Sequence, residues 1–368
     1  MSVISGGFYE KSGACNACCK RLQFSRQQPA QATLDRVGEM LDVRTQAMTT
    51  LVTLTSASGF EVDIADIGAS IARISVPVQD EVRDVVLAYE DAEYYASDPF
   101  YLGATLGRYA NRIRCGRFRL NGGSYQLATQ VEHAGHTLHG GPSGFSRRRF
   151  QLDRSPDGRQ VTCRYISKHG EQGFPGRLDV AVEYWIVGDS ALVIDYKATA
   201  DRATILNLSN HSYFNLDGNR QTIADHELTV YASRYTPVDD EMIPTGDIVS
   251  VAGSPLDFRN AIRLADVLER DGGIDTNFVI DTGDDYIRHA ARLASPASGI
   301  CLDVHTTQPG IQVFTGNNLE SPFRQYGGIC LETQNFPDAP NQAAFPSATL
   351  LAGETYRQRS VYAFSVEP

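Results

Sequence analysis

The chain has 368 residues, of which 42% are hydrophobic and 21% charged, a composition typical of a globular protein with ample material for a core. Its formal net charge of −11 disfavours nucleic acid and anionic membrane surfaces as partners, because both require basic patches. No apolar run approaches the roughly 18 residues of a membrane-spanning helix, so we expect no membrane partner either.

Residues 1–50 differ in composition from the rest of the chain. They are rich in Gln, Arg, Ala and Cys, and a weak helical pattern runs through 34–41. We therefore expect an N-terminal appendage that is weakly structured or partly helical, followed by a single domain over 51–368.

The cysteines indicate the compartment. Seven of them form an odd, scattered set, which favours a reducing environment over a disulfide framework, and the N-terminus lacks the apolar core of a secretory signal. We therefore expect a cytoplasmic protein. Cys15, Cys18 and Cys19 form a close group. Structural zinc needs four ligands, and no second pair of Cys or His stands nearby, so we predict no zinc site there.

From about residue 51 the pattern is that of β-strands. Polar and apolar residues alternate, and Gly188-Asp189 and Asn121-Gly122-Gly123 are hairpin turn signals. Only 260–269 has a helical pattern. The expected strands and hairpins lie at 116–128, 159–167, 177–187, 191–200 and 354–366. Many short alternating strands predict an all-β fold, a large antiparallel β-sandwich with very few short helices.

The first polar cluster is GRYANRIRCGRF, with Arg108, Asn111 and Arg112. Guanidinium and amide groups suit the recognition of sugar hydroxyls, because together they offer several donors and an acceptor. Taken alone, the cluster is more simply interpreted as a surface of solvated arginines.

A second cluster contains His133, His136 and His139 at every third residue. On a strand or loop these positions do not converge as they would on a helix, so we predict no metal site. Instead, His139 precedes Gly140-Gly141, and glycine allows the backbone to approach a ligand closely. We expect His139 to be a hydrogen-bond donor held at a tight turn.

Three further polar residues stand out. His211 lies in NHSYFNL, Asp275 precedes the apolar run of DTNFVID, and Gln312 lies within QVFTGN. A structural histidine is the simpler interpretation of His211, and neither Asp275 nor Gln312 is informative alone.

Glu332 is the most informative residue. It stands inside the apolar run of GGICLETQNFPDAPNQ, between paired glycines and a proline-containing loop. A buried carboxylate must be paired, hydrogen-bonded or neutralised. Such a residue is interpreted as a working acid or base, with a structural ion pair as the alternative. Together with a histidine it provides an acid and a base that function near neutral pH.

No signature for a nucleotide, flavin or acyl-transfer site is present, so we predict no cofactor. The remaining clusters, in this order, resemble the aldose 1-epimerase (galactose mutarotase) family, and the likeness rests on TLHGGPSGF, NHSYFNL and CLETQNFPDAPNQAAFP in particular. The resemblance implies a β-sandwich that binds a free hexose in an open cleft. It assigns Glu332 as catalytic base and His211 as catalytic acid. The sugar-binding positions it implies are Asn111, Arg112, His139, Asp275 and Gln312.

The chemistry fits these residue types. Interconversion of α and β anomers removes a proton from the C1 hydroxyl and gives one to the ring oxygen O5, which requires one base and one acid. The resemblance implies a small-molecule sugar substrate, free aldohexoses of the galactose and glucose type. For the assembly we expect a monomer or homodimer.

Three alternatives stay open at this point. A hexose-6-phosphate epimerase would need a basic pocket, for which Arg108, Arg112 or Arg147–Arg149 are available. A non-catalytic sugar-binding domain need not keep both Glu332 and His211. A glycoside hydrolase would need two carboxylates, and Asp275 with Glu332 could supply them.

Overall fold

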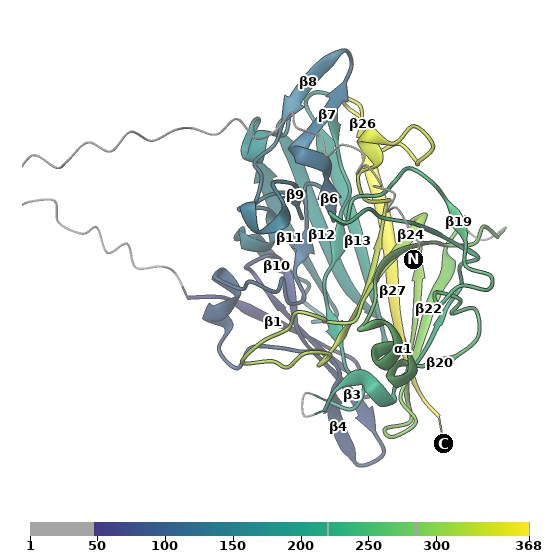
Figure 1. The fold of residues 1–368 in the computed structure, drawn as a ribbon. Helices are drawn as coiled ribbons and strands as arrows, with labels where there is room; N and C mark the ends of the chain where they lie inside the picture. Colours follow the sequence, from purple (N-terminus) through teal and green to yellow (C-terminus); the bar gives the residue numbers. More distant parts are fainter. Residues whose placement is uncertain (1–47, 219–220, 284–285, 368) are drawn as a thin grey trace, which may run out of the picture. The chain divides into compact units, whose positions relative to one another are not determined.

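The structure, a computed structural model, describes residues 48–218, 221–283 and 286–367, and antiparallel strands are its main regular structure (Figure 1). Most of the expected N-terminal appendage lies outside the described residues, and so do Cys15, Cys18 and Cys19. The described residues belong to one compact unit, Met48–Pro368. The domain division at residue 50 stays a prediction.

Two large sheets dominate the described residues. The larger has nine strands, in the order β10 (Gln151–Arg154), β11 (Gln160–Ser167), β12 (Leu178–Val187), β13 (Ala191–Ala200), β27 (Thr355–Val366), β23 (Ile300–Thr306), β22 (Arg288–Ala294), β17 (Glu227–Val230) and β20 (Ile262–Arg263). The second has six strands, in the order β16 (Tyr213–Phe214), β25 (Ile329–Gln334), β24 (Gly310–Phe314), β21 (Asp275–Val279), β18 (Arg234–Thr236) and β19 (Val249–Ser250).

The remaining strands form smaller sheets. One sheet has four strands, β1 (Leu51–Thr55), β2 (Glu61–Ala65), β3 (Ser70–Val78) and β4 (Glu81–Asp84). The others are pairs: β14 (Thr204–Ile205) with β26 (Thr349–Leu350), β15 (Ser209–Asn210) with β5 (Thr105–Leu106), β6 (Arg112–Ile113) with β9 (Thr137–Leu138), and β7 (Arg117–Leu120) with β8 (Gly123–Gln126).

The two large sheets share the largest hydrophobic core. Val182, Tyr184 and Ile194 of the nine-stranded sheet are buried in the same cluster as Val313 and Leu331 of the six-stranded sheet. Sheets whose inner faces interdigitate in this way form a sandwich, because each buries its apolar face against the other. The predicted antiparallel β-sandwich is confirmed.

The alternation in the sequence is realised most clearly in the hairpin of β12 and β13. Leu178, Val180, Val182, Tyr184 and Ile186 are buried in β12, as the period of two requires. The two strands pair from Leu178↔Ala200 to Val187↔Ala191, so the turn lies at 188–190 as predicted.

The predicted helix at 260–269 is displaced in the structure. Ile262 and Arg263 pair with β17 as strand β20, and helix α1 covers Leu264–Asp271. Gly272 ends α1 with a positive φ of 71°, and its N–H donates to the carbonyl of Leu268 at 3.1 Å, a common glycine cap. Helix α1 is the one α-helix of the described ranges, and no helix there is long and apolar enough to span a membrane. Short 3-10 turns lie at Ala92–Ala96, Arg114–Gly116, Val131–His133, Phe145–Arg147, Glu171–Gly173, Ile223–Asp225 and Ala339–Asn341.

Candidate active site

Strand β25 carries Glu332 into the interior. β25 lies between β16 and β24, and all of its residues are buried. Leu331 points into the sandwich core, and Glu332 faces the opposite side because side chains alternate along a strand. Only 2% of Glu332 is exposed, and its Oε2 atom finds no hydrogen-bond partner among the described residues. Burial raises the pKa of this carboxyl well above its ordinary value, and the charge of Asp275 raises it further.

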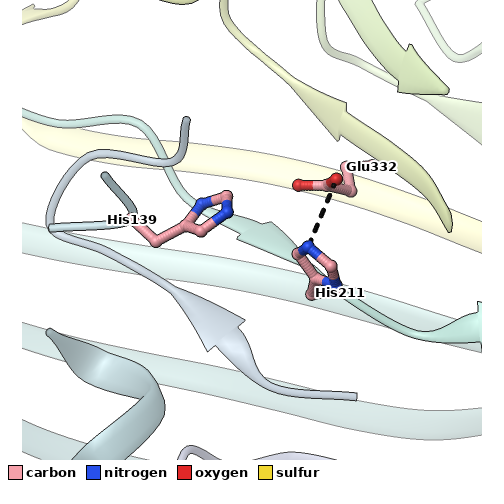
Figure 2. A group of neighbouring side chains, drawn as sticks. All are labelled: His139, His211 and Glu332. Atoms are coloured by element: carbon pink, nitrogen blue, oxygen red, sulfur yellow. Dashed lines mark ion pairs between the residues drawn. The ribbon is translucent and has the colours of Figure 1, made fainter. Parts of the chain in front are cut away.

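His211 faces Glu332 from the end of β15. Its backbone is clamped, since its N–H donates to the carbonyl of Ala104 and its own carbonyl accepts from the N–H of Gly103, both at 3.0 Å. Figure 2 shows one ring nitrogen of His211 directed at Glu332, where Nε2 lies 3.6 Å from Oε1. Burial lowers the pKa of His211 to about 4. The structure therefore brings the predicted acid and base together.

His139 reaches the same space from a tight turn (Figure 2). Its φ is +49°, and the ring lies edge-on to that of His211 with centroids 5.3 Å apart. The turn requires glycine at position 140, where a Cβ would lie 1.9 Å from the carbonyl oxygen of Gly107. The backbone N–H of Asn111 donates to His139 Nδ1 at 3.1 Å, so the neutral ring carries its proton on Nε2. This confirms the expected tight turn.

The polar residues beside this group are linked to one another. Arg112 Nη1 lies 3.9 Å from Asp275 Oδ2, and the side-chain amide of Gln312 donates to Asp275 Oδ1. Asn111 has a φ of +62° and accepts the N–H of Arg112 on its side-chain oxygen at 2.8 Å. Burial raises the pKa of Asp275, while Arg112 and Gln312 oppose the rise.

These side chains surround a cavity of about 120 Å³ that opens to solvent. Every predicted site residue except Gln312 lines it. Gln312 pairs with Glu332 across β24 and β25, and its side-chain amide contacts Asp275. The lining residues are Pro99, Phe100, Tyr101, Asn111, Arg112, His133, Leu138, His139, His211, Tyr213, Asp275, Phe314, Asn318 and Glu332.

The aromatic part of this lining was missed from the sequence. Tyr213 and Phe314 stand inside the motifs NHSYFNL and QVFTGN, so their position in those motifs was an available signal. Phe100 and Tyr101 carried none, because nothing local distinguishes them from core aromatics. The ring of Tyr101 packs on both histidines, with centroids 4.8 Å from His139 and 5.9 Å from His211.

The three side chains in Figure 2 also have the spacing of a metal site. Ligand-type atoms of His139, His211 and Glu332 all lie within 4.8 Å of one another, the one such group of three in the described residues. However, Asn111 donates to Nδ1 of His139, which leaves Nε2 as an N–H without a lone pair for a metal. We interpret His139 as a hydrogen-bond donor.

The arginines proposed for a phosphate pocket are engaged elsewhere. Only 2% of Arg108 is exposed, and it donates to Ser167 Oγ and to the carbonyls of Ser167, Lys168 and Pro175. Its interpretation as a solvated surface residue is therefore wrong. Arg147 donates to the backbone carbonyl of Asp98, while Arg148 pairs with Glu171 and Arg149 with Asp66. Among the lining residues described, Arg112 supplies the guanidinium, and it faces Asp275.

The comparisons with known proteins agree with this geometry. The family model described as aldose 1-epimerase matches residues 50–363. The galactose mutarotase of Homo sapiens is 40% identical over 317 residues, covering 83% of this chain and 91% of that protein. The aldose 1-epimerase of Escherichia coli K12 is 35% identical over 333 residues, covering 86% of this chain and 95% of that protein.

Solved structures share the fold. An aldose epimerase homologue from C. elegans superimposes with a TM-score of 0.82 at 28% identity, covering 87% of this chain and all (100%) of that one. The galactose 1-epimerase of Lactobacillus acidophilus gives a TM-score of 0.77 at 27% identity, covering 87% and 95%. The sequence match, the fold and the paired carboxylate and imidazole lead to one conclusion: the chain belongs to the aldose 1-epimerase family.

Proposed function

We propose that this chain interconverts the α and β anomers of free aldohexoses of the galactose and glucose type, with Glu332 as base and His211 as acid. One observation carries the assignment of roles. Glu332 has an unpartnered carboxyl oxygen in a cavity that opens to solvent, and His211 Nε2 faces its other oxygen at 3.6 Å. The relatives named galactose mutarotase and aldose 1-epimerase support the same reaction.

The reaction follows from these two groups. Glu332 removes the proton of the C1 hydroxyl while His211 gives its Nε2 proton to O5, and the C1–O5 bond breaks. Rotation about C1–C2 then presents the other face of the aldehyde. Ring closure returns the first proton from Glu332 and the second to His211, so the enzyme ends as it began. Positioning both groups around one sugar contributes to the rate by removing the entropy cost of bringing them together.

The substrate itself adjusts the protonation of the pair. Burial raises the pKa of Glu332 and lowers that of His211, so without substrate their shared proton rests on Glu332. A C1 hydroxyl that donates to Oε2 gives the carboxylate the partner it lacks, which lowers its pKa. The proton then moves to His211, and the pair reaches its reactive form only when a sugar is bound.

We assign the remaining polar residues to sugar binding. His139 offers its Nε2–H, Arg112 its guanidinium and Asp275 its carboxylate to hydroxyl groups in the cavity. Gln312 acts indirectly, since its side-chain amide donates to Asp275 and orients that carboxylate. Asn111 shapes the site through its backbone contacts with His139.

The first experiment measures optical rotation after freshly dissolved α-D-galactose or α-D-glucose is added. The wild type should speed the approach to equilibrium well above the buffer rate. His211→Asn should lower kcat by about 100- to 10,000-fold, because general acid catalysis contributes about that much. His305→Asn on β23 is the matched control and should keep the wild-type rate. If no free aldose is turned over faster than in buffer, the proposal is wrong, and hexose 6-phosphates and disaccharide hydrolysis should then be assayed.

The pH dependence tests the pairing. Below about pH 4 both His211 and Glu332 carry protons and no base is available, and above the raised pKa of Glu332 neither carries one. The wild-type kcat/KM should therefore be flat between these limits and fall on both sides. In His211→Asn the residual rate should rise with pH through the pKa of Glu332. A profile for this variant that matches the wild type would contradict the assignment.

We also propose a reducing compartment, the cytoplasm, because Cys163, Cys301 and Cys330 are thiols rather than disulfides in the described residues. A monomer or homodimer stays our prediction for the assembly. Light scattering of the purified chain measures it directly.

A further inference from the structure

The two histidines of the cavity differ in the group that contacts Nδ1. His139 Nδ1 accepts the backbone N–H of Asn111 at 3.1 Å. His211 Nδ1 instead contacts the thiol of Cys330, with Sγ at 3.4 Å, a sulfur hydrogen-bond distance. Both rings are buried, so neither nitrogen exchanges its partner for water.

The two partners have different capacities. A backbone N–H only donates, so protonation of His139 would set two donors against each other, and this ring is held neutral. A thiol both donates and accepts weakly. Cys330 is fully buried, and burial holds the pKa of its thiol well above the ordinary value, so the sulfur keeps its proton. The thiol can therefore serve either protonation state of His211.

One strand fixes both nitrogens of His211. Cys330 and Glu332 are two residues apart on β25, so their side chains lie on the same face. The imidazole spans them, with Nδ1 at Cys330 and Nε2 at Glu332. The other titratable groups packed on the ring are His139, Tyr101 and Tyr213, whose ring centroids lie 5.3, 5.9 and 5.0 Å away.

We propose that Cys330 is a positioning residue that lets His211 act as an acid where His139 cannot. This inference rests on the proposed role of His211. In the neutral ring the sulfur accepts Nδ1–H, which leaves the lone pair of Nε2 facing the protonated Glu332. When Nε2 takes the proton of Glu332, the sulfur keeps Nδ1–H, so the protonated ring has a partner that accepts at Nδ1. After Nε2 gives its proton to O5, the ring keeps Nδ1–H on the sulfur and Nε2 is ready to take the proton back.

The test compares Cys330→Val with Cys330→Ala. Val fills nearly the same volume but cannot hydrogen-bond, whereas Ala also leaves a cavity. Both variants should lower kcat about three- to tenfold, the loss expected from one ordinary hydrogen bond, with KM unchanged within twofold. Cys163→Val replaces another buried thiol, in the sandwich core, and should keep the wild-type kcat.

Nitrogen-15 NMR of the His211 ring provides a second reading that does not depend on turnover. At pH 7 and without sugar, the wild type should show the proton on Nδ1, and Cys330→Val should show a mixture of both tautomers. If Cys330→Val keeps the wild-type kcat and tautomer while only Cys330→Ala falls, Cys330 merely fills space and the inference is overturned. A wild type without activity on any aldose would refute the proposed function instead, and the NMR comparison would still decide the role of the thiol.

Discussion

Strands β12 and β25 place a glutamate in similar local sequence and in opposite surroundings. Glu183 on β12 lies on the outer face of the nine-stranded sheet, where 21% of its side chain is exposed and Lys197 lies 3.9 Å away. Glu332 on β25 is 2% exposed, with one oxygen unpartnered. Both strands bury one face in the same core, so the difference lies in what covers the second face. Water covers it at β12, and loops carrying His139 and Asn111 cover it at β25.

This contrast explains why a strand glutamate is unremarkable in one place and reactive in the other. A solvated carboxylate beside an ammonium group keeps its charge at little cost, since water and the cation stabilise that charge. A carboxylate removed from water without full hydrogen bonding is costly, and that cost appears as a raised pKa. The substrate relieves the cost, and binding is thereby coupled to chemistry.

The largest expected effect is that of exchanging each glutamate for its neutral amide. Glu332→Gln should lower kcat by about 100- to 10,000-fold, because the base is lost while shape is kept. Glu183→Gln should leave the rate unchanged within twofold. Polarimetry with α-D-galactose measures both, and equal rates for the two variants would remove the functional basis of the comparison.

Arginines allow the same comparison for stability. Arg108 is buried and donates to three carbonyls, whereas Arg164 is exposed on β11 of the outer face. Arg108→Ala should lower the free energy of unfolding by about 3–5 kcal/mol, because it leaves those carbonyls unsatisfied. Arg164→Ala should change it by less than about 0.5 kcal/mol. Urea denaturation measures both values, and a small loss for Arg108→Ala would show that water replaces the guanidinium.

A glycine pair tests the covering loop. At Gly140, φ is +87° and a Cβ would meet backbone at 1.9 Å, whereas at Gly135, φ is +75° and nothing lies within 4 Å. Gly140→Ala should displace His139 and lower kcat/KM at least about tenfold, as misplaced groups lose that much. Gly135→Ala carries only the left-handed strain, about 1 kcal/mol of stability, and should keep kcat/KM. Thermal unfolding run beside the assay separates a displaced loop from an unfolded protein, and unchanged kcat/KM in Gly140→Ala would contradict the role of His139.

The last prediction is a pH dependence of stability. The pKa of Glu332 is higher in the folded than in the unfolded chain, so the folded state binds the extra proton. Its contribution to stability is therefore complete below the unfolded value and is lost as pH rises toward the folded one, at about 1.4 kcal/mol per unit of difference. Relative to the wild type, Glu332→Gln should therefore gain stability as pH rises above the unfolded value of about 4.3. Parallel wild-type and Glu332→Gln curves would mean that Glu332 is not desolvated.

Much of the fold was predictable because its rules are local. Alternation of polar and apolar residues marked β12 and β13, and Gly188-Asp189 marked the turn between them. The helix at 260–269 was placed too early because Ile262 and Arg263 have partners on β17, a distant strand that no local pattern reveals. The end of α1 depends on the left-handed conformation of Gly272, and a glycine at this place in the sequence is a local signal for the end of a helix.

The sequence by itself determined the residue types of the site, the antiparallel class of the fold and, through the motifs around His211 and Glu332, the family. Only the tertiary structure decided which polar groups share one cavity. It placed the amide of Gln312 in contact with Asp275, buried Arg108 among backbone carbonyls, and set Cys330 against the second nitrogen of His211. The physical reason is that alternation along a strand specifies two faces, whereas burial, pKa and hydrogen-bond partners depend on what distant segments bring to each face.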